Sequence, residues 1–460
     1  MTKTMGTTAD ETRRGEFWVF QVQYLFVYLL TMFADWLQGT HMYVLYESYS
    51  LKDSVGSVGE YHPSRWGKTA IATLFTTGFL CSGLFGTFVG SLVDRYGRKN
   101  GVVLFCVLEI AINTMEEYED MRVLLLGRVL GGISTSLLFS AFESWMVTEH
   151  RKRDFPDEWL SHTFAYGQIG NGIVAIIAGL TADVAVNFQG NIGPFRCAVL
   201  ISAIVLGYVS LVWTENAGDV GKNALANFPL AWNAIWKDYR IMLVGFTNAF
   251  FEGAMYTFVF NWFPAMSVVY PGEKMHAGTI FSTFMACITL GGYLFNIASS
   301  TGLSNGWITL YLLCISSLSL IVPAIFPHNF WCVYGGFLLF ETCVGASFAT
   351  GGALRSAVMP QELQATIMNI FRVPLNILVV IGTSLDTFAS TRQKLFVCVH
   401  WLVFAVILQA VFVASIEKAK ISAPAKKIVT PFLKRIAKRS MVRVSRSNTP
   451  KRSNKKVENK

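Results

Sequence analysis

The stretch Gly90-Ser-Leu-Val-Asp94-Arg95-Tyr-Gly97-Arg98-Lys99 lies between two apolar blocks and ends in a cluster of charged residues. Gly90 permits two helices to cross closely and Gly97 permits a tight turn, because glycine carries no Cβ atom. The basic residues favour contact with an anionic membrane surface. We expect Asp94 to lie at the N-terminus of a neighbouring helix or beside an arginine, since positive charge stabilises a carboxylate there. The stretch therefore predicts a charged turn between two membrane-spanning helices.

The rest of the chain consists largely of similar apolar blocks. Of its 460 residues, 53% are hydrophobic and 15% are charged, whereas about 25% of the residues in an average soluble domain are charged. A helix of about twenty apolar residues crosses the roughly 30 Å of hydrocarbon in a bilayer. We therefore predict an all-α membrane protein with twelve transmembrane helices, at residues 17–42, 68–92, 101–116, 122–147, 162–187, 196–214, 240–264, 277–299, 306–326, 329–353, 363–385 and 395–416.

The basic residues of the short loops predict that both termini face the cytoplasm. Loops on the cytoplasmic side of a membrane protein carry an excess of Lys and Arg. Here the even-numbered loops carry that excess, at residues 95–99, 151–153 and 222–240 and at Arg355, and the basic tail follows. The third loop carries acids instead, from Glu116 to Asp120.

A polar linker divides the chain into two halves. We distinguish a cytoplasmic N-terminus (1–16), an N-terminal six-helix half (17–214), a cytoplasmic linker (215–238), a C-terminal six-helix half (239–416) and a basic cytoplasmic tail (417–460). The linker contains Gly218, Gly221 and Pro229. Two parallel repeats joined in this way are expected to move against each other about a site at the bilayer midplane.

Four acids lie inside apolar spans, one on the leading helix of each triplet of spans. Each stands beside an aromatic residue, and they are Asp35, Glu143, Glu252 and Glu341. An acid in a spanning helix is costly unless it faces water or a partner. Their recurrence on related helices predicts that they line an aqueous pathway and that at least one carries a proton during transport. Interhelical pairing for stability alone is the open alternative.

The charged turn resembles the loop signature of the major facilitator superfamily, G-x-x-x-D-[RK]-x-G-[RK]-[RK]. In the fourth span, Gly127-Arg128-x-x-x-Gly132 resembles a further motif of that superfamily, and Gly127 and Gly131 favour close helix packing. The segments 34–38, 138–145 and 371–375 resemble, more narrowly, the molybdate-anion transporter family, also called major facilitator domain-containing protein five. The resemblance implies a twelve-helix secondary transporter of the plasma membrane that takes up molybdate, with the charged turn as a latch for one gating state.

Molybdate is a dianion, so a pathway with four acids needs a basic counterpart. Arg372, in the middle of the eleventh span, and Arg128, in the fourth, are the two candidates. We expect Arg372 to contact the anion and the acids to serve as proton sites, since a protonated carboxyl can donate a hydrogen bond to an oxyanion. A structural ion pair between Arg372 and one of the acids is the open alternative.

Other classes of function receive no support from the sequence. It contains no nucleophile elbow, no complete phosphate-binding loop and no histidine cluster with metal-ligand spacing. We therefore predict no enzymatic activity, no catalytic residue, no cofactor and no metal, and we expect a monomer that binds a small anionic substrate and no nucleic acid. Transport of another small solute, such as an organic cation or a sugar, and a non-transporting membrane sensor with the same fold are the alternatives.

The tail holds fifteen of the 38 Lys and Arg residues of the chain. Thr430 and Pro431 are typical of a helix start, with threonine as the cap and proline in the first turn. The following residues alternate between apolar and basic faces at helical spacing, from Phe432 to Arg439. This pattern predicts a short amphipathic helix that binds the anionic lipids of the inner leaflet and is released by phosphorylation of nearby serines.

Overall fold

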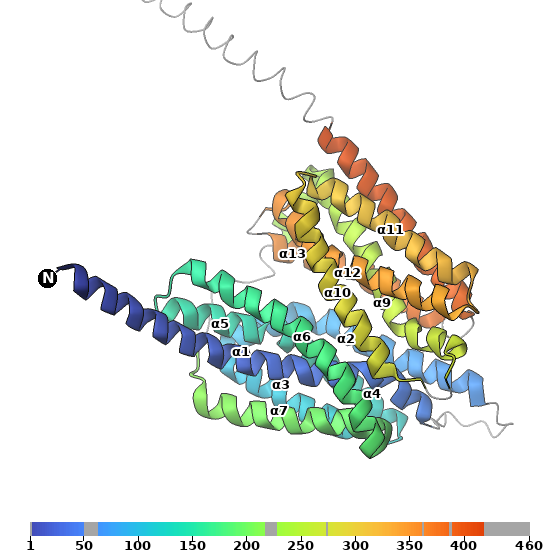
Figure 1. The fold of residues 1–460 in the computed structure, drawn as a ribbon, viewed down its shortest axis with the longest axis horizontal. Helices are drawn as coiled ribbons and strands as arrows, with labels where there is room; N and C mark the ends of the chain where they lie inside the picture. Colours follow the sequence, from blue (N-terminus) through green and yellow to red (C-terminus); the bar gives the residue numbers. More distant parts are fainter. Residues whose placement is uncertain are drawn as a thin grey trace, which may run out of the picture. The chain divides into compact units, whose positions relative to one another are not determined.

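The computed structural model describes residues 2–49, 63–216, 228–272, 275–360, 363–385 and 389–417. In these ranges the regular structure is helical throughout (Figure 1). The predicted amphipathic helix of the tail lies outside the described residues, as do Gly218 and Gly221 of the linker.

Fourteen α-helices are described. Their bounds are α1 Thr2–Ser48, α2 Pro63–Tyr96, α3 Arg98–Met115, α4 Met121–Leu138, α5 Ala141–Lys152, α6 Asp157–Gln189, α7 Gly193–Val212, α8 Phe228–Lys237, α9 Tyr239–Val269, α10 Ala277–Ser300, α11 Asn305–Ile325, α12 Phe330–Val358, α13 Gln364–Ser384 and a last helix, Thr391–Glu417. We refer to α1–α7 as the N-terminal half and to α9–α13 with the last helix as the C-terminal half.

The described helices account for twelve spans. Nine stretches are long and apolar enough to cross a membrane, and one of them, Glu158–Val212, contains both α6 and α7. Two further long helices, α3 and α9, are more polar, since they carry Glu109 and Glu252 inside their spans. In lipid a helix satisfies its own backbone hydrogen bonds, so these polar side chains do not prevent spanning when they face other helices.

The fourth span is interrupted, whereas the sequence predicted one continuous helix. α4 ends at Leu138 and α5 begins at Ala141. The hydroxyl of Ser136 donates to the carbonyl of Gly132 (2.9 Å), and that of Ser140 donates to the carbonyl of Ser136 (2.7 Å). Such bonds from serine to the preceding turn bend helices.

Helices also form in two polar segments outside the predicted spans. The first 16 residues, expected to be a polar terminus, continue α1 back to Thr2, because they contain no proline to interrupt it. The 47 residues of α1 extend about 70 Å at 1.5 Å per residue. The end of the linker forms α8, whose Phe228, Trp232 and Trp236 are spaced four apart and share one exposed face.

The structure places Arg355 in a helix, whereas the sequence predicted a loop. The expected place was a cytoplasmic loop, but the residue belongs to the last turn of α12. Hydropathy does not distinguish a basic residue in the last helical turn from one in the following loop, because cations are favourable in both places.

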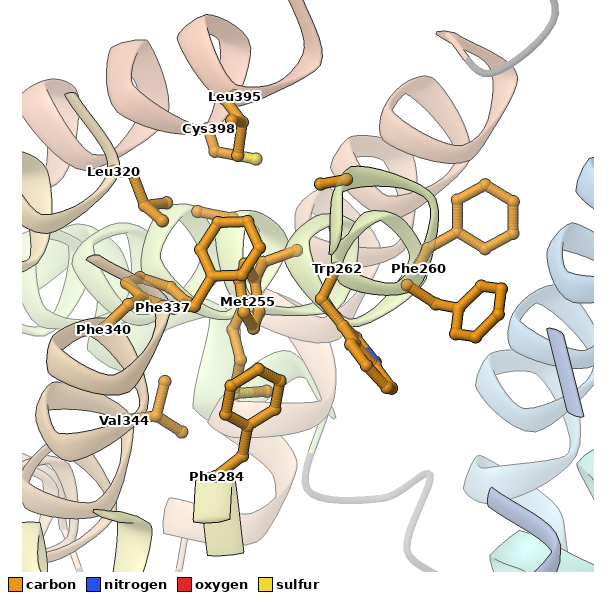
Figure 2. Packing of buried hydrophobic residues seen from close by; sticks show 14 of the residues in the cluster. Met255, Phe260, Trp262, Phe284, Leu320, Phe337, Phe340, Val344, Leu395 and Cys398 are labelled. Atoms are coloured by element: carbon orange, nitrogen blue, oxygen red, sulfur yellow. The ribbon is translucent and has the colours of Figure 1, made fainter. Parts of the chain in front are cut away.

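Buried aromatic residues form the core of the C-terminal half (Figure 2). Phe258 of α9 packs against Phe337 and Phe340 of α12, with ring centroids 4.9 Å apart in both pairs. The same cluster includes Tyr43 and Tyr46 of α1, so it continues into the N-terminal half. A second cluster, from Phe20 to Trp213, fills the N-terminal half.

Glycines set the closest helix crossings. A Cβ atom on Gly291 of α10 would overlap the carbonyl oxygen of Thr342 in α12, two helices that lie side by side in Figure 1. In the N-terminal half, the close crossing of α4 with α2 is made at Gly132, where a Cβ would lie 2.5 Å from that of Cys81. Gly131, which the sequence pattern favoured, has no such neighbour within 4 Å.

We predict that Gly291→Ala destabilises the protein, because the added methyl group forces α10 and α12 apart. Overpacking of this kind costs about 1–3 kcal/mol, and a lower unfolding temperature of the detergent-solubilised protein would report it. Gly292→Ala is the matched control, since a Cβ at that neighbouring residue meets nothing within 4 Å. Equal unfolding temperatures for the two variants would contradict the crossing.

Candidate transport pathway

A carboxylate joins the two halves at one end of the bundle, which we call the Asp183 end. Asp183 of α6 accepts hydrogen bonds from the backbone N–H groups of Gly278 (2.9 Å) and Thr279 (2.7 Å), at the N-terminus of α10. The hydroxyl of Thr279 donates to it as well, and His41 Nε2 of α1 lies 3.6 Å away. The free N–H groups of a helix start carry partial positive charge, which stabilises the carboxylate.

Further contacts between the halves lie near the Asp183 end. Tyr43, close to the end of α1, packs against Phe263 of α9 with ring centroids 5.6 Å apart. The hydroxyls of Thr76 in α2 and Thr383 in α13 are hydrogen-bonded at 2.7 Å. Both halves are therefore held together where α1 ends and α2 begins.

The charged turn lies at the opposite ends of these helices. Asp94, whose side chain is 46% exposed, accepts hydrogen bonds from Arg98 Nε (2.9 Å) and Nη2 (2.8 Å). Arg98 also donates to the hydroxyl of Thr148 in α5. Arg95 is exposed and stacks over the ring of Tyr96, and Gly90 lies within α2. The sequence predicted either a helix N-terminus or an arginine as the partner of Asp94, and in the structure the partner is an arginine.

Another acid, Glu215, occupies the helix N-terminus in this region. It lies after α7 at the start of the linker and accepts hydrogen bonds from the backbone N–H groups of Lys99 and Asn100, both at 3.0 Å. Gly97 has φ of +106°, and a Cβ there would lie 2.5 Å from the carboxyl carbon of Glu215. Gly97 is thus required both by its backbone conformation and by the approach of Glu215. Sequence reasoning missed Glu215 because it stood in a polar linker.

Arg128 is held in a buried ion pair. Its Nη2 lies 2.5 Å from Glu116 Oε1, and the two side chains are 14% and 1% exposed. Tyr46 donates its hydroxyl to the same carboxylate at 2.9 Å, and the hydroxyl of Tyr49 donates to the backbone carbonyl of Glu116 at 2.5 Å. Burial, with Glu116 nearby, raises the pKa of Tyr49, which lies beyond the end of α1, to about 12. The positive charge of Arg128 is therefore neutralised locally.

Glu109 of α3 is a buried acid that the sequence analysis did not single out. Its carboxylate accepts hydrogen bonds from Gln38 of α1 (2.8 Å), Ser134 of α4 (2.6 Å) and Asn113 (3.2 Å). Its position in the middle of a span was a usable signal, but α3 is not a leading helix of a triplet. Asp35 of α1, half-buried, interacts electrostatically with this carboxylate.

The four predicted pathway acids lie in different surroundings. Among the described residues, no hydrogen bond joins any two of them. Glu143 is exposed in the first turn of α5 and interacts electrostatically with Tyr24 and Tyr28 of α1. Glu341 is buried in α12, near Cys287 of α10. The structure therefore does not gather the acids into one cluster.

Among the four acids, Glu252 is the one on which arginines act electrostatically. On α9, half-buried, it interacts electrostatically with Arg355 of α12 and Arg372 of α13. Tyr256, one turn further along α9, interacts with both Glu252 and Arg372. Sequence analysis had identified Glu252 and Arg372 separately, and the structure brings them together.

Arg372 reaches from the C-terminal half to the N-terminal half. Its Nη1 atom lies 3.4 Å from the point where a Cβ on Gly86 of α2 would stand, and Ser136 Oγ of α4 is 3.7 Å from the same point. The arginine is exposed and forms neither an ion pair within 4.0 Å nor a hydrogen bond with any part of the chain that the structure describes. It is thus a charged donor group at the junction of the halves.

Comparison with known proteins agrees with this architecture. A major facilitator family model described as sugar transporters with 12 TM segments matches residues 2–346. The molybdate-anion transporter of Xenopus tropicalis is 32% identical over 419 residues, which cover 87% of each chain, and that of Danio rerio is 32% identical over 400 residues, which cover 79% of this chain and 78% of the relative. The chain belongs to the molybdate-anion transporter family of the major facilitators.

Solved structures support the fold of this family member. An auto-inhibited peptide transporter of the POT family has a TM-score of 0.64 at 12% identity, over 85% of this chain and 96% of its own. A mutant of the nucleoside transporter NupG has a TM-score of 0.60 at 12% identity, over 86% of this chain and 99% of its own. These comparisons confirm that the chain has a multi-span transporter fold and belongs to a family of transporters and not of enzymes. The family model describes twelve spans.

We predict that Arg128 and Glu116 stabilise the fold as a pair. Arg128→Met leaves a buried carboxylate uncompensated, which typically costs about 3–5 kcal/mol and should lower the unfolding temperature. Adding Glu116→Gln should restore much of the loss, since the double variant buries no unpaired charge. If Arg128→Met instead unfolds at the wild-type temperature and loses substrate affinity, Arg128 belongs to the pathway.

Proposed function

We propose that the protein is a secondary active transporter that takes up molybdate, or a similar tetrahedral oxyanion, across the plasma membrane by alternating access. The names of the relatives that share about a third of its residues support molybdate. Arg372 supports an anion, because it presents a planar, always charged donor group to the junction of the halves without an ion-pair partner among the described residues.

Alternating access requires contacts between the halves that can break and form again. The bonds from Asp183 to α10 and between Thr76 and Thr383 are of this kind, since each joins one half to the other through polar groups that water can replace. Their position supports a state that is closed at the Asp183 end. In the opposite state the charged turn around Asp94 would take over the closing role.

Proton coupling is part of the proposal, through Glu252. Arg355 of α12, Arg372 of α13 and Tyr256 of its own helix are the titratable groups that interact electrostatically with this carboxyl. A charged Glu252 repels an approaching dianion, whereas a protonated Glu252 leaves both arginines available to it. Binding of the anion and of a proton would therefore favour each other.

Sugar transport is a second candidate, because the family model that matches most of the chain is described as one of sugar transporters. Buried acids and aromatic residues suit sugars and organic cations as well as proton coupling. Competition between molybdate and an unlabelled sugar or organic cation for uptake distinguishes these candidates.

We predict that cells lacking molybdate uptake accumulate molybdenum when they express the protein. Arg372→Lys keeps the charge but loses the planar fork, and should weaken affinity by a few-fold to about tenfold, with a larger loss for Arg372→Ala. Arg240→Lys is the control, since Arg240 pairs with Asp238 at the start of α9. No accumulation despite correct surface expression would contradict molybdate transport, and normal affinity in Arg372→Ala would make that arginine structural.

We also predict that Glu252→Gln separates transport from its driving force. The amide cannot release a proton, so exchange of substrate across the membrane should persist while accumulation driven by a pH gradient is lost. Asp35→Asn, Glu143→Gln and Glu341→Gln test the other acids in the same assay. Gradient-driven accumulation in all four variants would show that none of these acids couples transport to protons.

A further inference from the structure

A small polar cavity lies within the C-terminal half, beside Glu252 and between α9, α11 and α12. It measures about 60 Å³, and its polar lining includes Thr247, Asn248, Glu252, Thr309 and Arg355. Apart from Glu252, these residues were not predicted as pathway residues. Arg355 was predicted to lie in a loop, and its place in α12 is what brings it to the cavity.

Two donor atoms in the cavity lining have no partner. Thr247 is 3% exposed, and neither its Oγ1 nor the Nδ2 of Asn248 has a hydrogen bond to any group in the described ranges. The other hydroxyls of the lining differ, since Thr309 Oγ1 donates to the carbonyl of Asn305 (2.8 Å) and Ser347 Oγ to that of Val344 (2.6 Å). Buried polar atoms are nearly always hydrogen-bonded, so the unpaired donors indicate a bound group.

A guanidinium completes the donor set. Arg355 Nη1 lies 3.1 Å, and Asn248 Oδ1 3.6 Å, from the point where a Cβ on Gly351 would stand. The absence of a Cβ at Gly351 therefore leaves room for both side chains. A guanidinium, an amide N–H and a hydroxyl, all from residues that line one cavity, are groups that bind oxyanions by charge-assisted hydrogen bonds.

The size of the cavity selects a small ligand. One water needs about 10–15 Å³ of such space, so 60 Å³ holds roughly five atoms of that size. A tetrahedral oxyanion has five heavy atoms, whereas a sugar or an organic cation of metabolic size has more than twice as many. The cavity therefore suits a small anion such as molybdate or sulfate better than the larger candidates.

The charges around the cavity match a dianion together with one proton. Glu252 interacts electrostatically with both Arg355 and Arg372. Two arginines and a dianion sum to zero charge when Glu252 is protonated, and to minus one when it is ionised. Glu252 also links the cavity to Arg372 at the junction of the halves.

We infer that this cavity is a binding site for a tetrahedral oxyanion, in which Arg355, Asn248 and Thr247 donate hydrogen bonds to the anion. The inference rests on the proposed transport of an oxyanion and locates its site. Arg372, at the junction of the halves, then meets the anion on its way to or from the cavity.

The test measures binding of molybdate, and in a second arm of sulfate, to the full chain in nanodiscs by calorimetry. Thr247→Val keeps the shape of the side chain and removes a hydroxyl that has no protein partner among the described residues, so it should leave the unfolding temperature unchanged or higher. Loss of a hydrogen bond to a charged ligand should nevertheless weaken affinity by about tenfold or more. Gly351→Val, which places side-chain atoms against the guanidinium of Arg355, should weaken it as well.

Thr342→Val is the matched control, because the Thr342 hydroxyl on α12 already donates to the carbonyl of Leu338 (2.9 Å). If Thr247→Val and Gly351→Val both bind the two anions with wild-type affinity, the inferred binding site is wrong. The proposed transport still stands in that case if cells accumulate molybdate. If the protein binds sulfate, and Thr247→Val weakens that binding, the site is supported. If molybdate is then neither bound nor accumulated, molybdate is not the substrate. Binding of neither anion by the wild-type chain overturns the inference.

Discussion

Charge inside an apolar bundle must be compensated, and this constraint governs which polar contacts the structure makes. Taking an ion out of water is so costly that a buried charge persists only with a partner. Arg128 has Glu116, Glu109 has three hydrogen-bond donors, and Asp183 has the start of α10. These groups hold helices together, and their charge is already compensated within the protein.

The same constraint makes the remaining charges informative. Arg355 and Arg372 both interact electrostatically with Glu252, and one carboxylate cannot neutralise two arginines. The excess positive charge lies at the junction of the halves and beside a small cavity with unpaired donors. An anion from solution is the natural source of the missing negative charge. The compensated pairs thus mark the scaffold, and the uncompensated pair marks the proposed site.

Properties encoded in contiguous residues could be predicted from the sequence. The apolar blocks predicted the spans because spanning depends on the length and hydrophobicity of one segment. The charged turn indicated the fold through its resemblance to the superfamily signature, which lies within ten contiguous residues. The interruption of the fourth span was not predicted, since serines that bond to the preceding turn also occur inside continuous helices.

The site depends on partners far apart in the chain, and there the sequence was less informative. Glu215 caps α3 from 115 residues away, which no local pattern encodes. Arg372 could be singled out because an isolated base in an apolar run is unusual. Arg355 could not, because a basic residue at the end of a span is ordinary and only the packing of α12 against α9 gives it a different role.

The contact at the Asp183 end has an evolutionary consequence. Two of the bonds that Asp183 accepts come from backbone N–H groups, at Gly278 and Thr279. Every residue except proline supplies an N–H, so most substitutions in the first turn of α10 leave these donors in place. Substitutions in α6 can therefore change the strength of this contact far more readily than substitutions in α10. Lineages that retune how readily this end opens would be expected to do so mainly through α6.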